Sequence, residues 1–213
     1  MTFHPDILSI RQKKVLTKSG HFCSSRGFYL AGGTALAIHL GHRRSGDFYW
    51  FTRQSIPDPL RLAEDIRKAD IPFTTTQVER GTLYGAISGI RVSFMEYSYP
   101  LLEPCAAWLD YNCRLAAPAD IACMKLSAVT QRGSKKDFLD IYALASKIIP
   151  LDHMLKLYQK KFSVQDMGHV LFALTYFDDA NLERMPPMLW AVNWKAIRET
   201  ITQWVRVLAA SEQ

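Results

Sequence analysis

Two adjacent glycines lie between a short apolar run and a helical pattern, and they constrain the fold more than any other feature. The apolar run covers residues 28–31, Gly32 and Gly33 follow it, and the helical pattern continues to Leu40. Gly41 is typical of a helix C-terminus, because glycine adopts the left-handed backbone without a Cβ penalty. The sequence therefore predicts a strand that turns sharply into a helix, where backbone N–H groups face an approaching phosphate.

An acidic residue opens the next predicted strand. Asp47 precedes the aromatic residues 48–51, and Gly46 and Arg53 bound this pattern. Aromatic residues favour strands, so a second strand is expected from about Asp47. A carboxylate there is placed to hold a Mg²⁺ ion that bridges the phosphates of a nucleotide.

The remaining patterns predict an α+β fold, in which a small mixed β-sheet with flanking helices is followed by a helical C-terminal half. Apolar spacing predicts helices over residues 6–25 and 58–69. Two strands, over residues 82–87 and 90–97, are expected to form a hairpin, because the link Ser88-Gly89 contains glycine.

After Pro100 every pattern is helical. Helices are predicted over residues 118–129, 137–148, 151–161, 163–176 and 194–210. We therefore predict an α/β core over residues 1–100 and a helical region, packed on this core, over residues 101–213.

Composition and charge restrict the partners and the compartment. The 213 residues carry a formal net charge of +6 at pH 7, which favours anionic partners such as nucleotides or RNA. No charge-free run of about 18 apolar residues is present, so no helix is expected to cross a membrane. The N-terminus lacks a basic segment followed by an apolar one, so the expected compartment is the cytoplasm. The 4 cysteines form no Cys-x-x-Cys pair, so reduced and mostly buried thiols are expected.

Two blocks of sequence resemble the AbiEii/AbiGii toxin family of nucleotidyltransferases. The first covers residues 30–36 and resumes over residues 41–47 as Gly-His-Arg-Arg-Ser-Gly-Asp, and the second covers residues 124–140. The resemblance spans residues 28–145 and implies a polymerase-β-like core that uses a nucleoside triphosphate and Mg²⁺. It also implies transfer of a nucleotide to RNA or another acceptor, and a neighbouring antitoxin as the protein partner.

The resemblance also implies roles for residues in the two blocks. Asp47 is expected to hold the metal and to act in catalysis with Lys125 and Asp140. The predicted nucleotide-binding residues are Gly32, Gly33, Thr34, His42, Arg43, Ser45, Arg132 and Lys136.

Structural roles are the alternative for several of these residues. His42 and Arg43 also suit a turn cap, and Ser45 suits a local bond to the backbone. Arg132 and Lys136 also suit a solvated basic loop. Asp140 lies in an apolar stretch of a helix, where a carboxylate is expected to pair with a cation such as Lys125 or Arg132.

Two of the three acidic positions that the family expects are not acidic in this chain. The family pattern is Asp-x-Asp, and the matching residues are Asp47-Phe48-Tyr49. Residues i and i+2 of a strand share one face, about 6.5 Å apart, where two carboxylates grip Mg²⁺ together. Tyr49 is neutral near pH 7 and is a poor ligand for a hard cation. Ser93 occupies the position at which the family expects the third acidic residue. Glu96, three residues further on, points to the opposite face of the strand from Ser93.

Three functions stay open from the sequence. The first is a working nucleotidyltransferase in which Asp47 holds Mg²⁺ with water and phosphate oxygens. The second is a catalytically impaired protein of the same fold that binds a nucleotide, an RNA or a partner protein. The third is an interaction protein whose C-terminal helices bind a partner. Tyr49 separates the first from the others, because metal-bridged phosphoryl transfer depends on the ion to neutralise developing charge.

Overall fold

A mixed β-sheet forms one half of the protein in the computed structural model, which describes residues 2–211. Seven strands are present within this range, in the order β3-β4-β5-β2-β1-β7-β6. β2 runs parallel to β5 and β1 runs parallel to β7, while the other neighbours are antiparallel. The strands are β1 (Tyr29–Ala31), β2 (Phe48–Thr52), β3 (Phe73–Glu79), β4 (Thr82–Ile87), β5 (Ile90–Glu96), β6 (Ala106–Trp108) and β7 (Cys113–Leu115).

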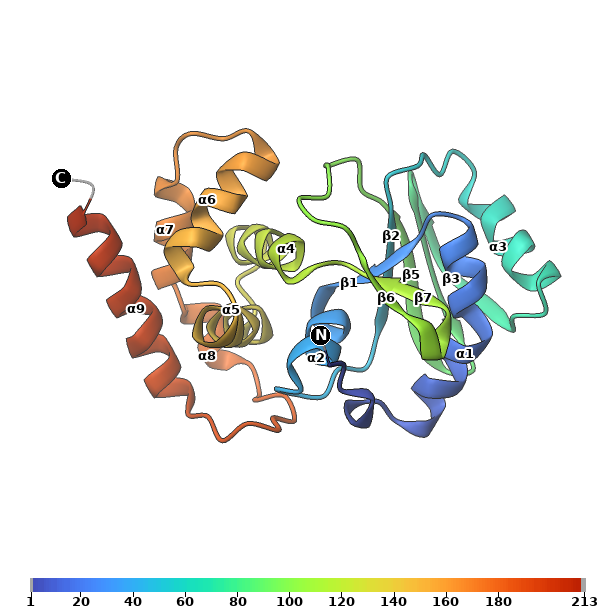
Figure 1. Cartoon of the computed structure of the whole chain (residues 1–213), viewed down its shortest axis with the longest axis horizontal. Helices are drawn as coiled ribbons and strands as arrows, with labels where there is room; N and C mark the ends of the chain where they lie inside the picture. Colours follow the sequence, from blue (N-terminus) through green and yellow to red (C-terminus); the bar gives the residue numbers. More distant parts are fainter. Residues whose placement is uncertain (1, 212–213) are drawn as a thin grey trace.

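Helices cover the sheet and continue beyond it as a separate layer (Figure 1). α1 (Ile10–Ser25) and α3 (Pro59–Lys68) lie at the sheet, and α2 (Gly32–Leu40) contacts both the sheet and the helical half. The helical half contains α4 (Pro118–Gln131), α5 (Lys135–Lys147), α6 (Leu151–Phe162), α7 (Gly168–Thr175), α8 (Asp178–Leu182) and α9 (Trp194–Ser211). Two short 3₁₀ helices cover Pro5–Ile7 and Leu109–Tyr111. The predicted α+β class, with a mixed sheet followed by helices, is confirmed.

Several element boundaries follow from local chemistry. Ser9 caps α1 in a capping box with Gln12, so the helix predicted from residue 6 starts at Ile10. Gly41 ends α2 with a φ of 64°, as its position in the sequence predicts. The hairpin between β4 and β5 is also confirmed, and φ is 50° at Ser88 and 78° at Gly89. Two left-handed residues are what a type I′ hairpin turn requires.

The prediction that every element after Pro100 is helical is wrong. β6 and β7 lie in this part of the chain, and Leu115 of β7 pairs with Leu30 of β1. Each strand has only 3 residues, which is too short to produce an alternating pattern. The sheet therefore extends past residue 100, and the helical region begins at Pro118.

Three further differences have local causes. β3 was not expected, because its residues are mostly polar and exposed, as an edge strand allows. The helix predicted over residues 163–176 begins only at Gly168, since Ser163 ends α6 with a φ of 54°. α8 has only 5 residues and carries no periodic signal.

Large aromatic side chains fill the core between the sheet and its helices. Phe48, Trp50 and Phe94 are completely buried. Phe94 meets Phe28 and Phe73 edge-on, with ring centroids 5.3 and 5.9 Å apart. No helix among residues 2–211 has the length and apolar character needed to cross a membrane.

The close packing of α1 on the β6–β7 hairpin predicts the effect of Gly20→Ala. A Cβ at Gly20 would overlap the main-chain carbonyl of Tyr111. Such an overlap costs about 1–3 kcal/mol, against a gain of at most about 1 kcal/mol from helix propensity. Urea unfolding should therefore show a lower free energy of unfolding for Gly20→Ala.

The control for this measurement is Thr17→Ala, on an exposed position of the same helix. Its free energy of unfolding should change by less than about 0.5 kcal/mol. Equal or greater stability of Gly20→Ala would show that the helix and the hairpin do not pack this closely.

Candidate functional site

The turn between β1 and α2 forms as the sequence predicts. Gly32 has a φ of 71°, which is left-handed backbone that favours glycine. A Cβ on Gly33 would overlap the guanidinium of Arg43, so any larger residue here would displace that side chain. Ala31 at the N-cap has no polar side chain, so the first N–H groups of α2 need another partner.

A cavity of about 220 Å³ opens beside this turn, between the sheet and α4. Its lining residues are Gly32, Gly33, Arg43, Ser45, Asp47, Tyr49, Phe51, Met95, Met124, Lys125, Ala128, Arg132 and Lys136. The structure thus brings together every residue predicted for the site except Thr34, His42 and Asp140. The apolar members Phe51, Met95 and Met124 were not predicted, because apolar residues in elements are usually core.

Thr34 and His42 are completely buried and support the cavity wall from behind. The Thr34 hydroxyl donates to the main-chain carbonyl of Asp47 and lies 2.8 Å from the Ser45 hydroxyl. This contact fixes the chain where it enters β2. His42 instead contacts Asp140, with 2.8 Å between its Nε2 and the carboxylate.

Asp140 is the centre of a buried ion-pair cluster. Arg43 donates to both carboxylate oxygens, from Nε at 2.7 Å and Nη2 at 2.8 Å. Lys125 Nζ lies 2.6 Å from the second oxygen, and His42 Nε2 donates to the first. Asp140 therefore does not reach the cavity itself, but it holds two cations that do.

A second carboxylate, Asp137, ties the linker between α4 and α5 to the same cluster. It accepts from Lys125 Nζ at 2.8 Å and from Ser134 Oγ at 2.9 Å. Arg132 donates to it twice, from Nε at 2.8 Å and Nη2 at 3.1 Å. Of the two partners considered for Asp140, Lys125 is thus correct, whereas Arg132 pairs with Asp137.

The cations keep both carboxylates ionised despite their burial. Burial by itself would raise the pKa of Asp140, but Arg43, Lys125 and the hydrogen bond from His42 outweigh it and hold this pKa well below its ordinary value. The pKa of Asp137 is also lowered, because Lys125 and Arg132 outweigh the effect of burial. Burial lowers the pKa of His42 despite its contact with Asp140, so the ring is neutral near pH 7.

A segment from the C-terminal part of the chain holds the loop that carries Arg43. The N–H of Arg44 donates to the carbonyl of Pro187 at 2.9 Å. The carbonyl of His42 accepts from the N–H groups of Leu189 and Trp190, at 2.9 and 3.2 Å. The Trp190 ring also packs edge-on against the His42 ring, with centroids 5.8 Å apart. We call residues 187–190 the strap.

The donor set at the expected metal position does not fit a divalent cation. The carboxylate of Asp47 accepts two hydrogen bonds from Arg91, each of 2.9 Å. The next positions are Tyr49 and Ser93, which pair with each other across β2 and β5 and carry no charge near pH 7. Over residues 2–211 no three His, Cys, Asp or Glu side chains form a group able to hold a metal ion.

Glu96 does not supply the missing acid. Its carboxylate accepts from the N–H of Ile56 at 3.0 Å and from Ser55 Oγ at 3.2 Å, so it binds the segment after β2. The strand register places it beside Thr52, at the opposite end of β2 from Asp47.

Arg91, the ion-pair partner of Asp47, is a charged residue beside the site that the sequence did not predict. β2 and β5 run parallel with Phe48 opposite Val92, so the preceding residues, Asp47 and Arg91, are neighbours at the strand starts. An arginine two residues before Ser93 shares its face of the strand. The parallel pairing was the information needed to place Arg91 beside Asp47.

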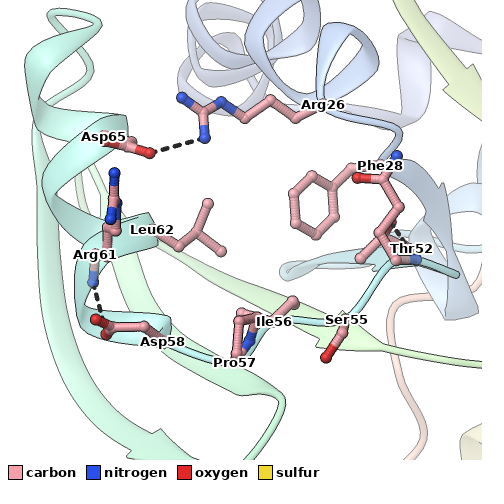
Figure 2. A pocket seen from close by; sticks show the side chains of 11 residues that line it. Arg26, Phe28, Thr52, Ser55, Ile56, Pro57, Asp58, Arg61, Leu62 and Asp65 are labelled. Atoms are coloured by element: carbon pink, nitrogen blue, oxygen red, sulfur yellow. Dashed lines mark hydrogen bonds and ion pairs between the residues drawn. The ribbon is translucent and has the colours of Figure 1, made fainter.

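A second cavity, of about 320 Å³, lies between the end of β2, the end of α1 and α3 (Figure 2). Phe28, Ile56 and Leu62 give it apolar walls, and an ion pair of 2.8 Å between Arg26 and Asp65 crosses its mouth. None of the residues predicted for the site lines this cavity. The cavity beside the glycine turn is therefore the candidate functional site.

The strand order, the glycine turn and the acidic start of β2 define a nucleotidyltransferase-type fold. The solved structure of MenT4, a nucleotidyltransferase toxin from Mycobacterium tuberculosis H37Rv, superposes with a TM-score of 0.59 at 17% identity, covering 92% of this chain and 81% of that one. JHP933 from Helicobacter pylori superposes with a TM-score of 0.52 at 16% identity, covering 99% of each chain. At these identities the likeness shows the shared fold.

The chain belongs to the AbiEii family, described as "Nucleotidyl transferase AbiEii toxin, Type IV TA system", whose family model matches residues 24–206. A protein of Aquifex aeolicus (strain VF5), named "Uncharacterized protein aq_aa25", is 40% identical over 178 residues, which are 83% of this chain and 86% of that protein. The resemblance noted in the two sequence blocks is thereby confirmed, and the match extends through the helical region.

The buried cluster predicts a pH-dependent stability that Asp140→Asn removes. The pKa of Asp140 is lower in the folded chain than in the unfolded one, so its contribution is complete above about pH 4 and is lost as the pH falls further. Removing one partner of a buried ion pair costs about 3–5 kcal/mol. At pH 7 the free energy of unfolding of Asp140→Asn, measured with urea, should be lower than that of the wild type by about this amount.

Below about pH 4 the difference between the two proteins should narrow steadily toward the lowered pKa of Asp140, because the unfolded wild type binds a proton that the folded wild type does not. Asp152→Asn is the control, since its pair with Lys156 is exposed and separated by 3.9 Å. A constant difference in stability between pH 7 and pH 3 would contradict the ionised state of Asp140.

Proposed function

We propose that the protein binds a nucleoside triphosphate in the cavity beside the glycine turn and that its transferase activity is weak or lost. One observation carries this proposal: the cavity keeps the glycines and cations of a nucleotide site, while Tyr49 and Ser93 stand where further carboxylates are needed. Binding of an anionic ligand requires the glycines and the cations, which are present. Metal-bridged transfer requires the additional carboxylates, which are absent.

The cavity offers groups suited to each part of a nucleotide. The N–H groups at the start of α2 suit the phosphates, because the positive end of the helix dipole lies there. Arg132, directly after α4, and Lys136, in the first turn of α5, line the cavity and have exposed side chains. The apolar side chains of Phe51 and Met124 offer a surface for the base.

A metal-dependent transferase is the second candidate function. It is favoured by the carboxylate of Asp47, which lines the cavity together with Gly32 and Gly33. For this function Asp47 would hold Mg²⁺ in place of its ion pair with Arg91, Lys125 would neutralise phosphates, and RNA or another molecule would accept the nucleotide. Membership of a family described as part of a type IV toxin–antitoxin system makes an antitoxin the proposed protein partner, and the cytoplasm stays the proposed compartment.

Nucleotide binding should raise the thermal stability of the protein. A ligand at a hundred times its Kd stabilises a folded protein by about 2.7 kcal/mol. Each nucleoside triphosphate should be compared with buffer by thermal shift, on the wild type and on Lys136→Glu. Charge reversal at Lys136 places an anion at the cavity and should abolish the shift.

Lys156→Glu is the matched control, because Lys156 is an exposed residue of α6 outside the cavity. Its shift should equal that of the wild type. A shift of the same size in Lys136→Glu would place the nucleotide elsewhere, and the absence of any shift in the wild type would remove the proposed function.

Restoring the carboxylates should separate the two candidate functions. The wild type, the double variant Tyr49→Asp with Ser93→Asp, and Asp47→Ala should be incubated with radiolabelled nucleoside triphosphates, Mg²⁺ or Mn²⁺, and total RNA or protein. We expect no label transfer by the wild type and measurable transfer by the double variant, because adjacent carboxylates suit a divalent cation. Transfer by the wild type that is lost in Asp47→Ala would instead establish the second candidate.

A further inference from the structure

We propose that Arg91 is the built-in cation of this site: it binds the polyphosphate of the nucleotide directly, so that binding needs no divalent metal. This inference rests on the proposed function, since it names a ligand group for the same cavity. The inference follows from the side chains at the expected metal position, which do not suit the divalent cation that the fold family implies.

Arg91 is held where it can meet a ligand of the cavity. Its Nε and Nη2 each donate to one oxygen of Asp47 at 2.9 Å, which fixes the plane of the guanidinium. Asp47 lines the cavity, and its side chain is 21% exposed, whereas that of Arg91 is 81% exposed. A guanidinium has five N–H donors, so those not directed at Asp47 remain for phosphate oxygens.

The strand register surrounds this pair with neutral groups. Asp47 and Tyr49 share one face of β2, and Arg91 and Ser93 share the same face of β5. The ring of Tyr49 lies beside Gly32, so the space next to the turn holds an aromatic ring in place of a carboxylate. A divalent cation entering here would meet one carboxylate that is already bound and a fixed positive charge.

The protein side chains at this site supply by themselves an excess positive charge equal to that of a divalent ion. The charged side chains that line the cavity, with their ion-pair partners, are the cations Arg43, Arg91, Lys125, Arg132 and Lys136 and the carboxylates Asp47, Asp137 and Asp140. The excess is two positive charges. With carboxylates at Tyr49 and Ser93 the excess would be zero, and a triphosphate would then need a cation to approach.

Isothermal titration of the full chain with ATP, in EDTA and in Mg²⁺, tests the inference. We expect the Kd of the wild type to differ by less than about threefold between the two conditions. Arg91→Ala should weaken binding in EDTA by about tenfold or more, as loss of a charged hydrogen bond predicts. The affinity of Arg91→Lys for ATP in EDTA should lie between those of the wild type and Arg91→Ala, because lysine keeps the charge and loses the paired donors.

Two further variants make the result specific. Arg67→Ala removes an exposed arginine of α3 outside the cavity and should leave the Kd unchanged. Asp47→Asn removes the carboxylate that a metal would need but keeps one side-chain oxygen that accepts from Arg91, so this variant should still bind ATP in EDTA. Because the Arg91 side chain is mostly exposed, Arg91→Ala should unfold at the same temperature as the wild type without ligand.

The outcomes separate this inference from the function on which it rests. Binding that appears only with Mg²⁺ and is lost in Asp47→Asn would overturn the role of Arg91 and keep the cavity as a nucleotide site. An affinity of Arg91→Ala for ATP in EDTA equal to that of the wild type would also overturn the role of Arg91 and keep the cavity as a nucleotide site. Absence of ATP binding in both conditions would remove the proposed function, and the inference with it.

Discussion

The carboxylate of Asp140 is fully buried where α5, α4 and the loop after α2 meet, and most of the site depends on it. An unpaired buried carboxylate costs several kcal/mol, so these three segments must come together with their charges matched. Arg43 and Lys125 supply that match, and the same two side chains line the cavity. One set of ion pairs therefore joins the helical half to the sheet half and orients cations toward the ligand space.

Much of the fold could be predicted from the sequence, because its main elements carry local signals. Gly41 ends α2 and Ser88-Gly89 turns the hairpin through backbone conformations that favour glycine and small polar residues. β7 could not be predicted in this way. It has 3 residues and exists because β1 offers an open edge, which is a property of the assembled sheet. β3 is stabilised by β4 and α3 in the same manner, so its polar sequence is sufficient.

The site was predictable where its residues follow each other in sequence, and less so where they meet through pairing. The glycine turn, Arg43 and Asp47 lie close together in the chain and were identified as one cluster. Arg91 was not, because its position beside Asp47 depends on β5 inserting parallel to β2 across 44 residues of sequence. The absence of carboxylates at Tyr49 and Ser93 was visible in the sequence, but the cation that accompanies it was visible only in the structure.

The strap has a consequence for how the C-terminal part of this chain varies. It holds the loop of His42 and Arg44 through main-chain N–H and carbonyl groups, which almost every amino acid provides. Substitutions over residues 187–190 therefore leave these bonds in place, provided that the backbone keeps its path and no proline replaces a donor. A contact of this kind depends on the path of the backbone and specifies no sequence motif, although the segment lies within the family match, which continues to residue 206.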